Sequence, residues 1–453
     1  MRFLAVVILL LGVSLAAQSD TSEAERVSAR AVQRLRDGRG DEAWTLLRQR
    51  VDNTTRSVVI RDIPRMGVSP ATVIRRLRTE SDVSARRALI LVLGGYGAED
   101  ISPVQRASVR SLLLQWHERD PDPGIHSAAE WLLRERGYGA APALSRKAAV
   151  ADRRWYVTAE GQSMAIVRGP ASVRMGSPAD EAGRQPATDS AAEPTHTVTI
   201  PRSFALATTE VTVAQFQRFL DADPEARRRY QYPDAPTRMA DVLARFSPDA
   251  DAPVIAVTWY EAAMYCNWLS AREGLPPSEW VYPAGVLADG MPLPADYLRR
   301  SGYRLPTEAE WELAVRAGTS TARFFGASDV FLPEYAWFAR HPPKTKSAPV
   351  DPQDPQRTSR VARLKPNDLG LFDVYGNVWE WTQDRVERFQ TADDREDRED
   401  TTLRVSDQDA RTRRGGAFPY GAEMARSAGR GPVTSLPTNR RDNLGFRIAR
   451  TMR

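Results

Sequence analysis

The chain of 453 residues is too long for one ordinary domain, so two or three domains are expected. Its 42% apolar and 27% charged residues are typical of a globular protein with a sizeable core, which argues against a disordered or fibrous chain. The net charge of +5 is weak for this length, and acids are interleaved with arginines, so the sequence indicates no basic stripe for nucleic acid.

Residues 1–17 predict a secretory signal peptide. Arg2 supplies the positive end, residues 3–13 are apolar, and residues 14–17 offer a small-residue cleavage site. The apolar run is shorter than the ~20 residues that a membrane-spanning helix needs, although an uncleaved N-terminal anchor is the alternative. We therefore expect a secreted, periplasmic or cell-envelope protein with no transmembrane helix after signal removal. Cys266 is the one cysteine, so no intrachain disulfide can form.

Residues 22–138 predict an all-α region. Apolar residues recur at three- and four-residue spacing, and glycines and prolines mark the breaks. The segment 120–134 resembles a HEAT-type repeat, and residues 81–89 are a weaker echo about forty residues earlier. An irregular helical bundle is the alternative, and either would offer an interaction surface. Residues 139–153 predict a linker.

From Trp155 onward the sequence predicts short strands separated by frequent Gly and Pro. Strands are expected near residues 165–169, 195–200 and 203–207. Helices are expected to begin after the N-caps Thr212, Thr258 and Thr307, the last with Glu310 in a capping box. The mixed-charge run at 385–412 predicts a solvated insertion loop.

Several motif blocks occur in a specific order in this second region. They are residues 175–178, 209–212, 253–263, 303–312, 376–381, 414–416 and 443–447. Together they resemble the formylglycine-generating enzyme, or sulfatase-modifying factor, superfamily over about residues 155–453. The resemblance implies a compact α+β domain related to C-type lectins, preceded here by the all-α, HEAT-like region.

The resemblance also implies a calcium site. In the superfamily calcium binds at the Gly-Asn-Val-Trp-Glu segment, which places side-chain ligands at Asp373 and Glu380 and carbonyl ligands at Gly376 and Val378. Calcium takes six to eight hard oxygens of these kinds. The alternative is that Asp373 caps a turn and Glu380 pairs with an arginine. A second calcium site of the enzymes, expected near residues 336–338, has no match here.

The catalytic cysteines of the superfamily are missing. The enzymes bind copper through two cysteines after the Arg-Gly-Gly block, where thiolates suit Cu(I). Here Tyr420 stands near the first position, and the sole cysteine, Cys266, is interpreted as packing inside a helix. Copper is therefore not expected, and no catalytic residue is assigned. Another branch binds iron through clustered histidines, but no His-x-x-x-His pair joins the four present, so iron is not expected: His117, His126, His196 and His341.

The leading hypothesis is an exported, non-oxidising member of the superfamily. Its domain would be a calcium-stabilised binding module for a protein, peptide or glycan of unknown identity. The predicted groove residues are Trp379, Tyr420, Arg426 and Arg430, with the alternative that Trp379 belongs to the core. The second hypothesis is an oxidoreductase that uses non-thiol ligands in the same groove, and the third is a structural part of a surface assembly.

Overall fold

The structure is a computed structural model, and it describes residues 21–144, 152–184, 193–231, 238–285, 287–341, 351–386, 393–432 and 434–453. The predicted signal peptide (1–17) and the centre of the predicted linker (145–151) lie outside these residues. Within the described ranges, no helix has both the length and the apolar character needed to span a bilayer.

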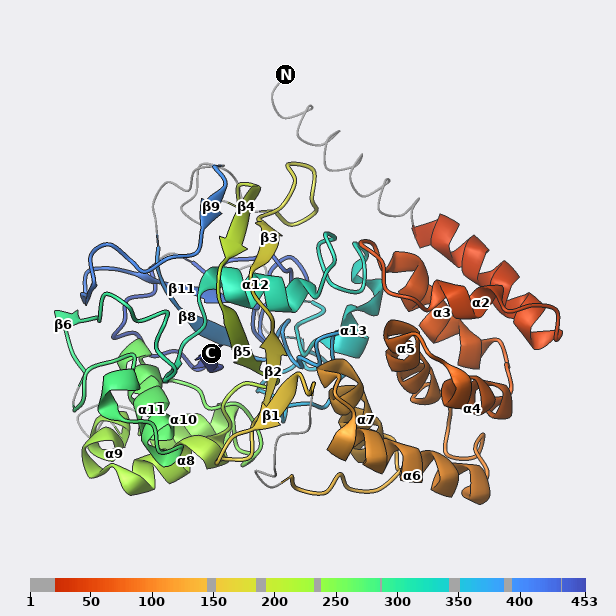
Figure 1. The fold of residues 1–453 in the computed structure, drawn as a ribbon, viewed down its shortest axis with the longest axis horizontal. Helices are drawn as coiled ribbons and strands as arrows, with labels where there is room; N and C mark the ends of the chain where they lie inside the picture. Colours follow the sequence, from red (N-terminus) through yellow and green to blue (C-terminus); the bar gives the residue numbers. More distant parts are fainter. Residues whose placement is uncertain are drawn as a thin grey trace.

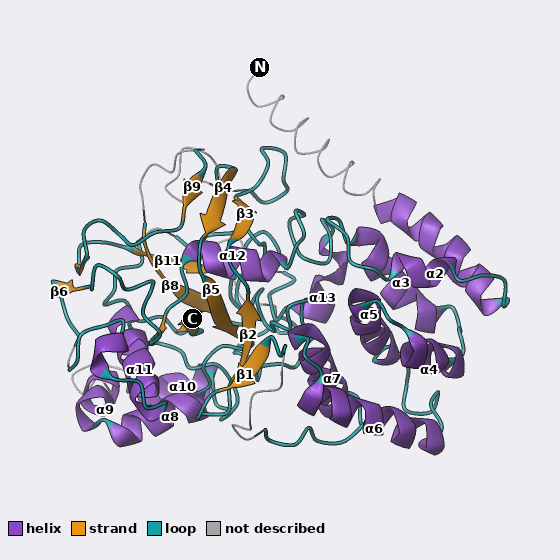
Figure 2. Ribbon diagram, in the orientation of Figure 1, coloured by secondary structure: helices purple, strands orange, loops and turns teal. Residues whose placement is uncertain are grey.

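The N-terminal region is all helical, as predicted, and forms one end of the molecule (Figures 1 and 2). After a helix at residues 21–36 come α2 (Glu42–Leu46), α3 (Thr54–Arg65), α4 (Pro70–Thr79), α5 (Val83–Leu93), α6 (Pro103–Arg119) and α7 (Pro123–Glu135). The side chains of Asp82, Ser102 and Asp122 each accept a first-turn N–H at the start of α5, α6 and α7. The HEAT-like nature of the region stays a prediction.

The C-terminal region combines short sheets with helices, which confirms the α+β prediction. A five-stranded sheet has the order β1 (Trp155–Val157), β2 (Ser163–Val167), β5 (Ser203–Ala207), β13 (Ala449–Met452) and β7 (Tyr303–Arg304). A second sheet orders β11 (Arg411–Arg414), β8 (Trp379–Arg385) and β12 (Leu444–Phe446). A third orders β3 (Ala171–Met175), β4 (His196–Ile200) and β9 (Arg395–Glu396), and β10 (Arg404–Val405) pairs with β6 (Met291–Pro292).

The structure describes six α-helices in this region, and the sequence predicts where three of them begin. They are α8 (Val213–Ala222), α9 (Pro224–Gln231), α10 (Met239–Phe246), α11 (Trp259–Arg272), α12 (Glu308–Arg316) and α13 (Leu332–Tyr335), with 3-10 turns at Pro277–Glu279 and Asp329–Phe331. Thr212, Thr258 and Thr307 cap α8, α11 and α12 in reciprocal capping boxes. These three predicted N-caps are confirmed.

The prediction of a solvated loop over 385–412 is wrong for part of that segment. Its residues supply β9, which pairs with β4, and β10, which pairs with β6. The Asp397 side chain is only 8% exposed, because it forms an ion pair with Arg202 and accepts a hydrogen bond from Thr307. Alternating charges predict solvation only when their partners lie within the run, and here the partners come from elsewhere.

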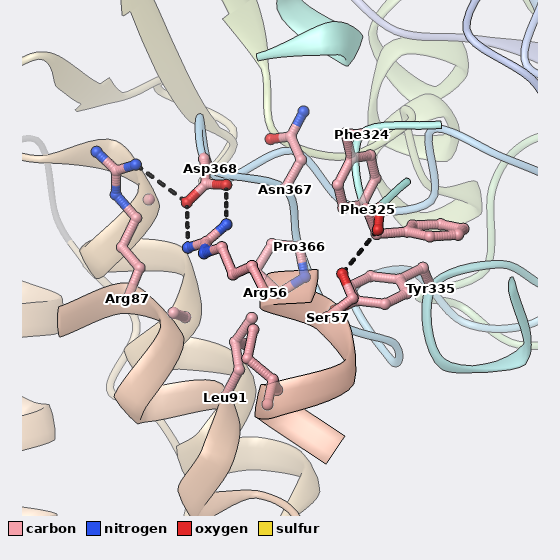
Figure 3. Close-up of a pocket in the computed structure, with 13 residues that line it drawn as sticks. Arg56, Ser57, Arg87, Leu91, Phe324, Phe325, Tyr335, Pro366, Asn367 and Asp368 are labelled. Atoms are coloured by element: carbon pink, nitrogen blue, oxygen red, sulfur yellow. Dashed lines mark hydrogen bonds and ion pairs between the residues drawn. The ribbon is translucent and has the colours of Figure 1, made fainter. Parts of the chain in front are cut away.

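The helical region and the C-terminal region are packed into one unit. The hydrophobic core of the helices includes Ala362 and Phe372 from the C-terminal region. At the junction, Asp368 accepts hydrogen bonds from Arg56 and Arg87 (Figure 3). Arg87 also pairs with Asp122 at the start of α7. The cavity beside these residues has a volume of only ≈ 20 Å³, so the two regions meet with little free space.

Candidate functional site

The segment from Gly370 to Trp381 makes a tight turn into β8, and this turn positions the predicted calcium ligands. Asp373 and Asn377 have positive φ values of 55° and 56°. A Cβ on Gly376 would lie 2.2 Å from the carbonyl oxygen of Trp337, so only glycine fits there. Asn377 donates its N–H to Trp337 and accepts from the Ser359 N–H, which fixes the turn against neighbouring loops.

Glu380, a predicted calcium ligand, is the partner of a buried arginine. Arg447 donates to both carboxylate oxygens at 2.6 Å, and Trp311 Nε1 donates at 2.8 Å. Glu380 and Arg447 are both 0% exposed. This matches the alternative that the sequence left open, in which Glu380 pairs with an arginine. Both carboxylate oxygens are already satisfied without a metal.

Asp373 lies beside a carboxylate that the sequence did not single out, Glu210. The Asp373 carboxylate accepts the Ala362 N–H at 2.7 Å, and burial raises the pKa of Asp373 to about 6. Glu210 is 0% exposed and accepts a hydrogen bond from Asn377, but its Oε2 has no partner. Burial, followed by the charge of Asp373, raises the pKa of Glu210. Carboxyl groups therefore outnumber the guanidinium group that pairs with them at this turn, and the raised pKa values favour the protonated form of two of them.

The predicted binding groove is closed, which corrects the assignment of three of its four residues. Trp379 and Arg426 are 0% exposed and Arg430 is 7% exposed, whereas Tyr420 is half-buried. The Trp379 ring therefore belongs to the core, which was the sequence's alternative. Side chains that contact only other protein groups cannot line an open groove for a ligand.

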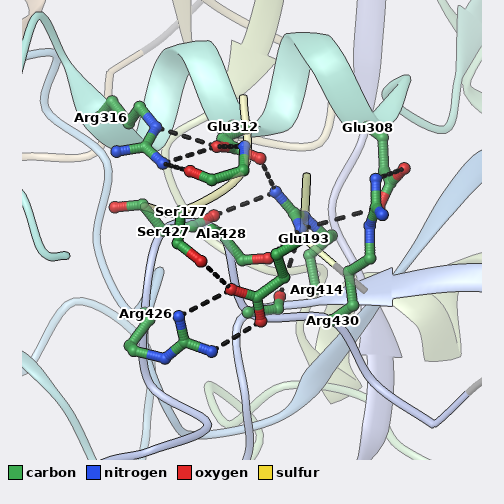
Figure 4. A network of polar contacts seen from close by, with 12 residues as sticks. Ser177, Glu193, Glu308, Glu312, Arg316, Arg414, Arg426, Ser427, Ala428 and Arg430 are labelled. Atoms are coloured by element: carbon green, nitrogen blue, oxygen red, sulfur yellow. Dashed lines mark hydrogen bonds and ion pairs between the residues drawn. The ribbon is translucent and has the colours of Figure 1, made fainter. Parts of the chain in front are cut away.

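Buried glutamates hold the arginines after the Arg-Gly-Gly block (Figure 4). Arg426 donates to Glu193 at 2.6 and 2.8 Å and to Glu181 at 2.7 Å. Arg430 donates to Glu308 at 2.7 and 2.9 Å, and Arg414 pairs with Glu312. This network of paired charges lies under α12 and is structural.

Arg413 and Arg441 are among the arginines with buried nitrogens that have no hydrogen-bond partner, as is Arg411, and the sequence did not single them out. Arg413 is 1% exposed, and its Nε and Nη1 have no hydrogen-bond partner. Its guanidinium lies 5.2 Å from the centre of the Trp379 ring, which in turn packs edge-on against Tyr420. Arg441 Nε is likewise buried without a partner. One sequence signal could have drawn attention here: the run Arg411–Arg414 places three arginines in one short strand.

Cys266 is inert, as the sequence predicts. Its side chain is 0% exposed within α11, and burial raises the pKa of the thiol, so the thiolate needed for nucleophilic or copper chemistry does not form near neutral pH.

Two of the four histidines come together, contrary to what their spacing suggests. Ligand atoms of His117, His126 and Glu130 lie within 4.8 Å of one another. However, the two imidazole rings stack with an interplanar angle of 8°. Burial lowers the pKa of His126 to about 3, which keeps its ring neutral and does not by itself oppose metal binding. An imidazole binds a metal in its own ring plane, so two stacked rings do not direct their nitrogens at one ion. His126 Nδ1 instead contacts the carbonyl of His117 at 2.7 Å.

Comparisons with known proteins agree with the motif blocks. Residues 156–452 match the family described as "Sulfatase-modifying factor enzyme 1-like domain". A formylglycine-generating enzyme from Mycobacterium tuberculosis is 32% identical over 212 residues, which are 42% of this chain and 66% of that protein. An "Inactive C-alpha-formylglycine-generating enzyme 2" from Bos taurus is 29% identical over 210 residues, 44% of this chain and 50% of that protein. The matches thus cover between half and just under two thirds of the length of these two relatives.

Among solved structures, Treponema denticola variable protein 1 aligns with 64% of this chain and 95% of its own chain, at 24% identity and a TM-score of 0.46. PvdO from Pseudomonas aeruginosa aligns with 66% of this chain and 98% of its own, at 22% identity and a TM-score of 0.44.

Proposed function

The chain belongs to the sulfatase-modifying factor enzyme 1-like domain family, and from this premise we propose that it is an exported, non-oxidising member that acts as a binding module. One observation carries the proposal: the sole cysteine is Cys266, buried in α11, so no pair of thiolates can hold copper after the Arg-Gly-Gly block. The similarity to a relative named as inactive supports it. Export rests on residues 1–17, and the mass of the mature exported protein would test their removal.

A peptide oxidation assay tests the missing activity. The purified chain, supplied with copper and oxygen, is incubated with a Cys-x-Pro-x-Arg peptide, and the peptide mass is measured. We expect no conversion of the cysteine to the aldehyde, because the chain lacks the thiolates that bind Cu(I). A copper-loaded formylglycine-generating enzyme is the positive control. An aldehyde product with this chain would overturn the proposal.

Calcium is a second part of the proposal. The turn contains an excess of buried carboxylates: Glu210, Asp373 and Glu380 face one guanidinium, Arg447, and Glu210 Oε2 has no partner. A divalent cation would neutralise this excess and cross-link the turn. Asp373 with the carbonyls of Gly376 and Val378 are the predicted ligands, and Glu210 is a further carboxylate nearby. Glu380 stays with Arg447.

We expect calcium to raise the thermal unfolding midpoint of the protein. Binding at a hundred times the Kd stabilises a folded state by about 2.7 kcal/mol. The midpoint is measured in CaCl₂, in MgCl₂ and in EGTA, for the natural protein and for Asp373→Ala. The calcium-specific increase should vanish in the variant, since it lacks a predicted ligand. Equal midpoints of the natural protein in CaCl₂ and EGTA would exclude the calcium site and leave the binding module standing.

A second candidate function is an oxidoreductase with non-thiol ligands. The proximity of His117, His126 and Glu130 favours it, and the stacking of the two rings opposes it. Metal analysis of the purified protein separates the two functions: iron or copper at one equivalent per chain would support the oxidoreductase, and their absence would support the binding module.

A further inference from the structure

Arg413 is a buried charge without a counter-charge. Its side chain is 1% exposed and is confined between Trp379 and Gly431, where a Cβ would lie 2.3 Å from Arg413 Cγ. Among the residues that the structure describes, no carboxylate forms an ion pair with it, and its Nε and Nη1 donate no hydrogen bond. Arg426 and Arg430 differ, because each binds a glutamate through two hydrogen bonds. Arg411 of the same strand is also 1% exposed with Nε and Nη2 unpartnered, but its Nη1 donates to the Gln383 carbonyl.

A second arginine increases the positive charge at this place. Arg441 is half-buried, and its Nε also lacks a partner. Burial and then the charge of Arg441 lower the pKa of Arg413 to about 10, so Arg413 still carries its charge at neutral pH. Asp442 follows Arg441 in the chain, but within the described ranges no ion pair joins it to either arginine. The two guanidinium groups therefore repel each other. The described groups that oppose this repulsion are the Trp379 ring and Tyr420 beside Arg413, and Asp442 near Arg441, none of which forms an ion pair with either arginine.

Such an arrangement is unfavourable in the protein alone. Burying a charge without a partner costs far more than leaving it in water, and guanidinium N–H groups without acceptors add to that cost. A bound oxyanion would reduce both the cost of the unpaired charge and that of the N–H groups without acceptors. A guanidinium offers a planar set of donors that fits carboxylate, phosphate and sulfate oxygens. Tyr420 and Arg441 are only half-buried, so one side of the cluster reaches solvent.

We propose that Arg413 and Arg441 form an anion-binding site for an oxyanion group of the ligand, with Tyr420 at its entrance. The site lies beside Tyr420, which stands near the first cysteine position of the enzymes. Its assignment to the ligand rests on the proposed binding function, but the anion site itself does not depend on whether the chain oxidises peptides. The chemical class is a carboxylate, phosphate or sulfate group, which small anions can mimic.

The test uses the full chain and three probes, sodium acetate, phosphate and sulfate, at constant ionic strength balanced with chloride. Binding is measured by titration calorimetry and by the thermal unfolding midpoint. At least one probe should raise the midpoint of the natural protein. Arg413→Met and Arg441→Met should each weaken the affinity of the protein for that probe by about tenfold or more, since each removes a charge-assisted hydrogen bond. Arg404→Met, which removes an exposed arginine of β10, is the matched control and should bind as the natural protein does.

The stability of Arg413→Met without added anion gives an independent readout. Removal of an uncompensated buried charge should leave the midpoint unchanged or raise it. Arg426→Met, which leaves Glu193 and Glu181 unpaired, should lower it strongly. A response to acetate alone identifies a carboxylate ligand, and a response to phosphate or sulfate identifies a tetrahedral one.

Two results would overturn the anion site. The first is that none of the three probes binds the natural protein, or raises its unfolding midpoint, more than it does for Arg413→Met. The other is an Arg413→Met midpoint lowered as far as that of Arg426→Met, since this would mean that Arg413 has a counter-charge within the protein. Neither result bears on the peptide oxidation assay, so a failed anion site and a failed non-oxidising function are distinguishable.

Discussion

Asp368→Asn is expected to lower the free energy of unfolding by about 3–5 kcal/mol, the cost of breaking a buried ion pair by removing one partner. Asp368 binds two arginines of the helical region, Arg56 through both carboxylate oxygens and Arg87 at 3.1 Å. Burial opposes its ionisation, but the two guanidinium groups hold the pKa of Asp368 below its ordinary value. The amide would leave the buried Arg56 without a counter-charge, whereas Arg87 keeps its ion pair with Asp122.

Urea unfolding followed by circular dichroism measures this effect. The natural protein should unfold in one transition, because Ala362 and Phe372 of the C-terminal region belong to the core of the helices. In Asp368→Asn the transition should shift to lower urea. Asp249→Asn removes an exposed carboxylate and serves as the control with an unchanged midpoint. Two separate transitions in the natural protein would contradict the single packed unit.

Arg447→Met should be at least as damaging to stability. The guanidinium is 0% exposed and donates to Glu380, to the Ala207 carbonyl and to the Phe372 carbonyl. Its removal leaves Glu380 without a counter-charge beside Glu210 and Asp373, so we expect a loss of about 3–5 kcal/mol at neutral pH. The loss is measured by urea unfolding of the full chain.

The double variant Glu380→Gln, Arg447→Met separates the ion pair from general packing. The double variant should lose less unfolding free energy than the two single variants lose together, because it leaves no unpaired charge at this position. Arg398→Met is the control, since Arg398 pairs with Glu396 on the surface at 72% exposure and its loss should change stability little. Strict additivity of the two buried variants would mean that Glu380 and Arg447 do not stabilise each other.

The local features of the chain were predictable from neighbouring residues. A capping box needs only a threonine and an acid or amide three residues later, so Thr212, Thr258 and Thr307 could be identified without tertiary information. Most breaks between the N-terminal helices contain glycine or proline, but those at residues 47–53 and 80–82 contain neither, and Pro64, which was predicted to mark a break, lies inside α3. The ordered motif blocks identified the family, because they depend on residue types and order along the chain.

The candidate site was predicted only in part, because the role of each acid depends on which charged group the fold places beside it. Asp373 and Glu380 were both identified as acids of the turn, yet the sequence offered no means to choose between calcium and an arginine as the partner of Glu380. The arginine that binds it, Arg447, lies 67 residues away in the chain. Glu210, which lies near the same turn, comes from a different motif block.

The sequence by itself determined the family, the α+β class and the lack of a cysteine pair, since residue identity and order are sufficient for each of these. Only the tertiary structure decided which arginines meet a carboxylate. Arg413 and Arg426 look alike in the sequence, but Arg426 meets Glu193 from 233 residues away while Arg413 meets no acid among the described residues. The energy of a buried charge depends on what the fold places beside it, and local sequence does not contain that information.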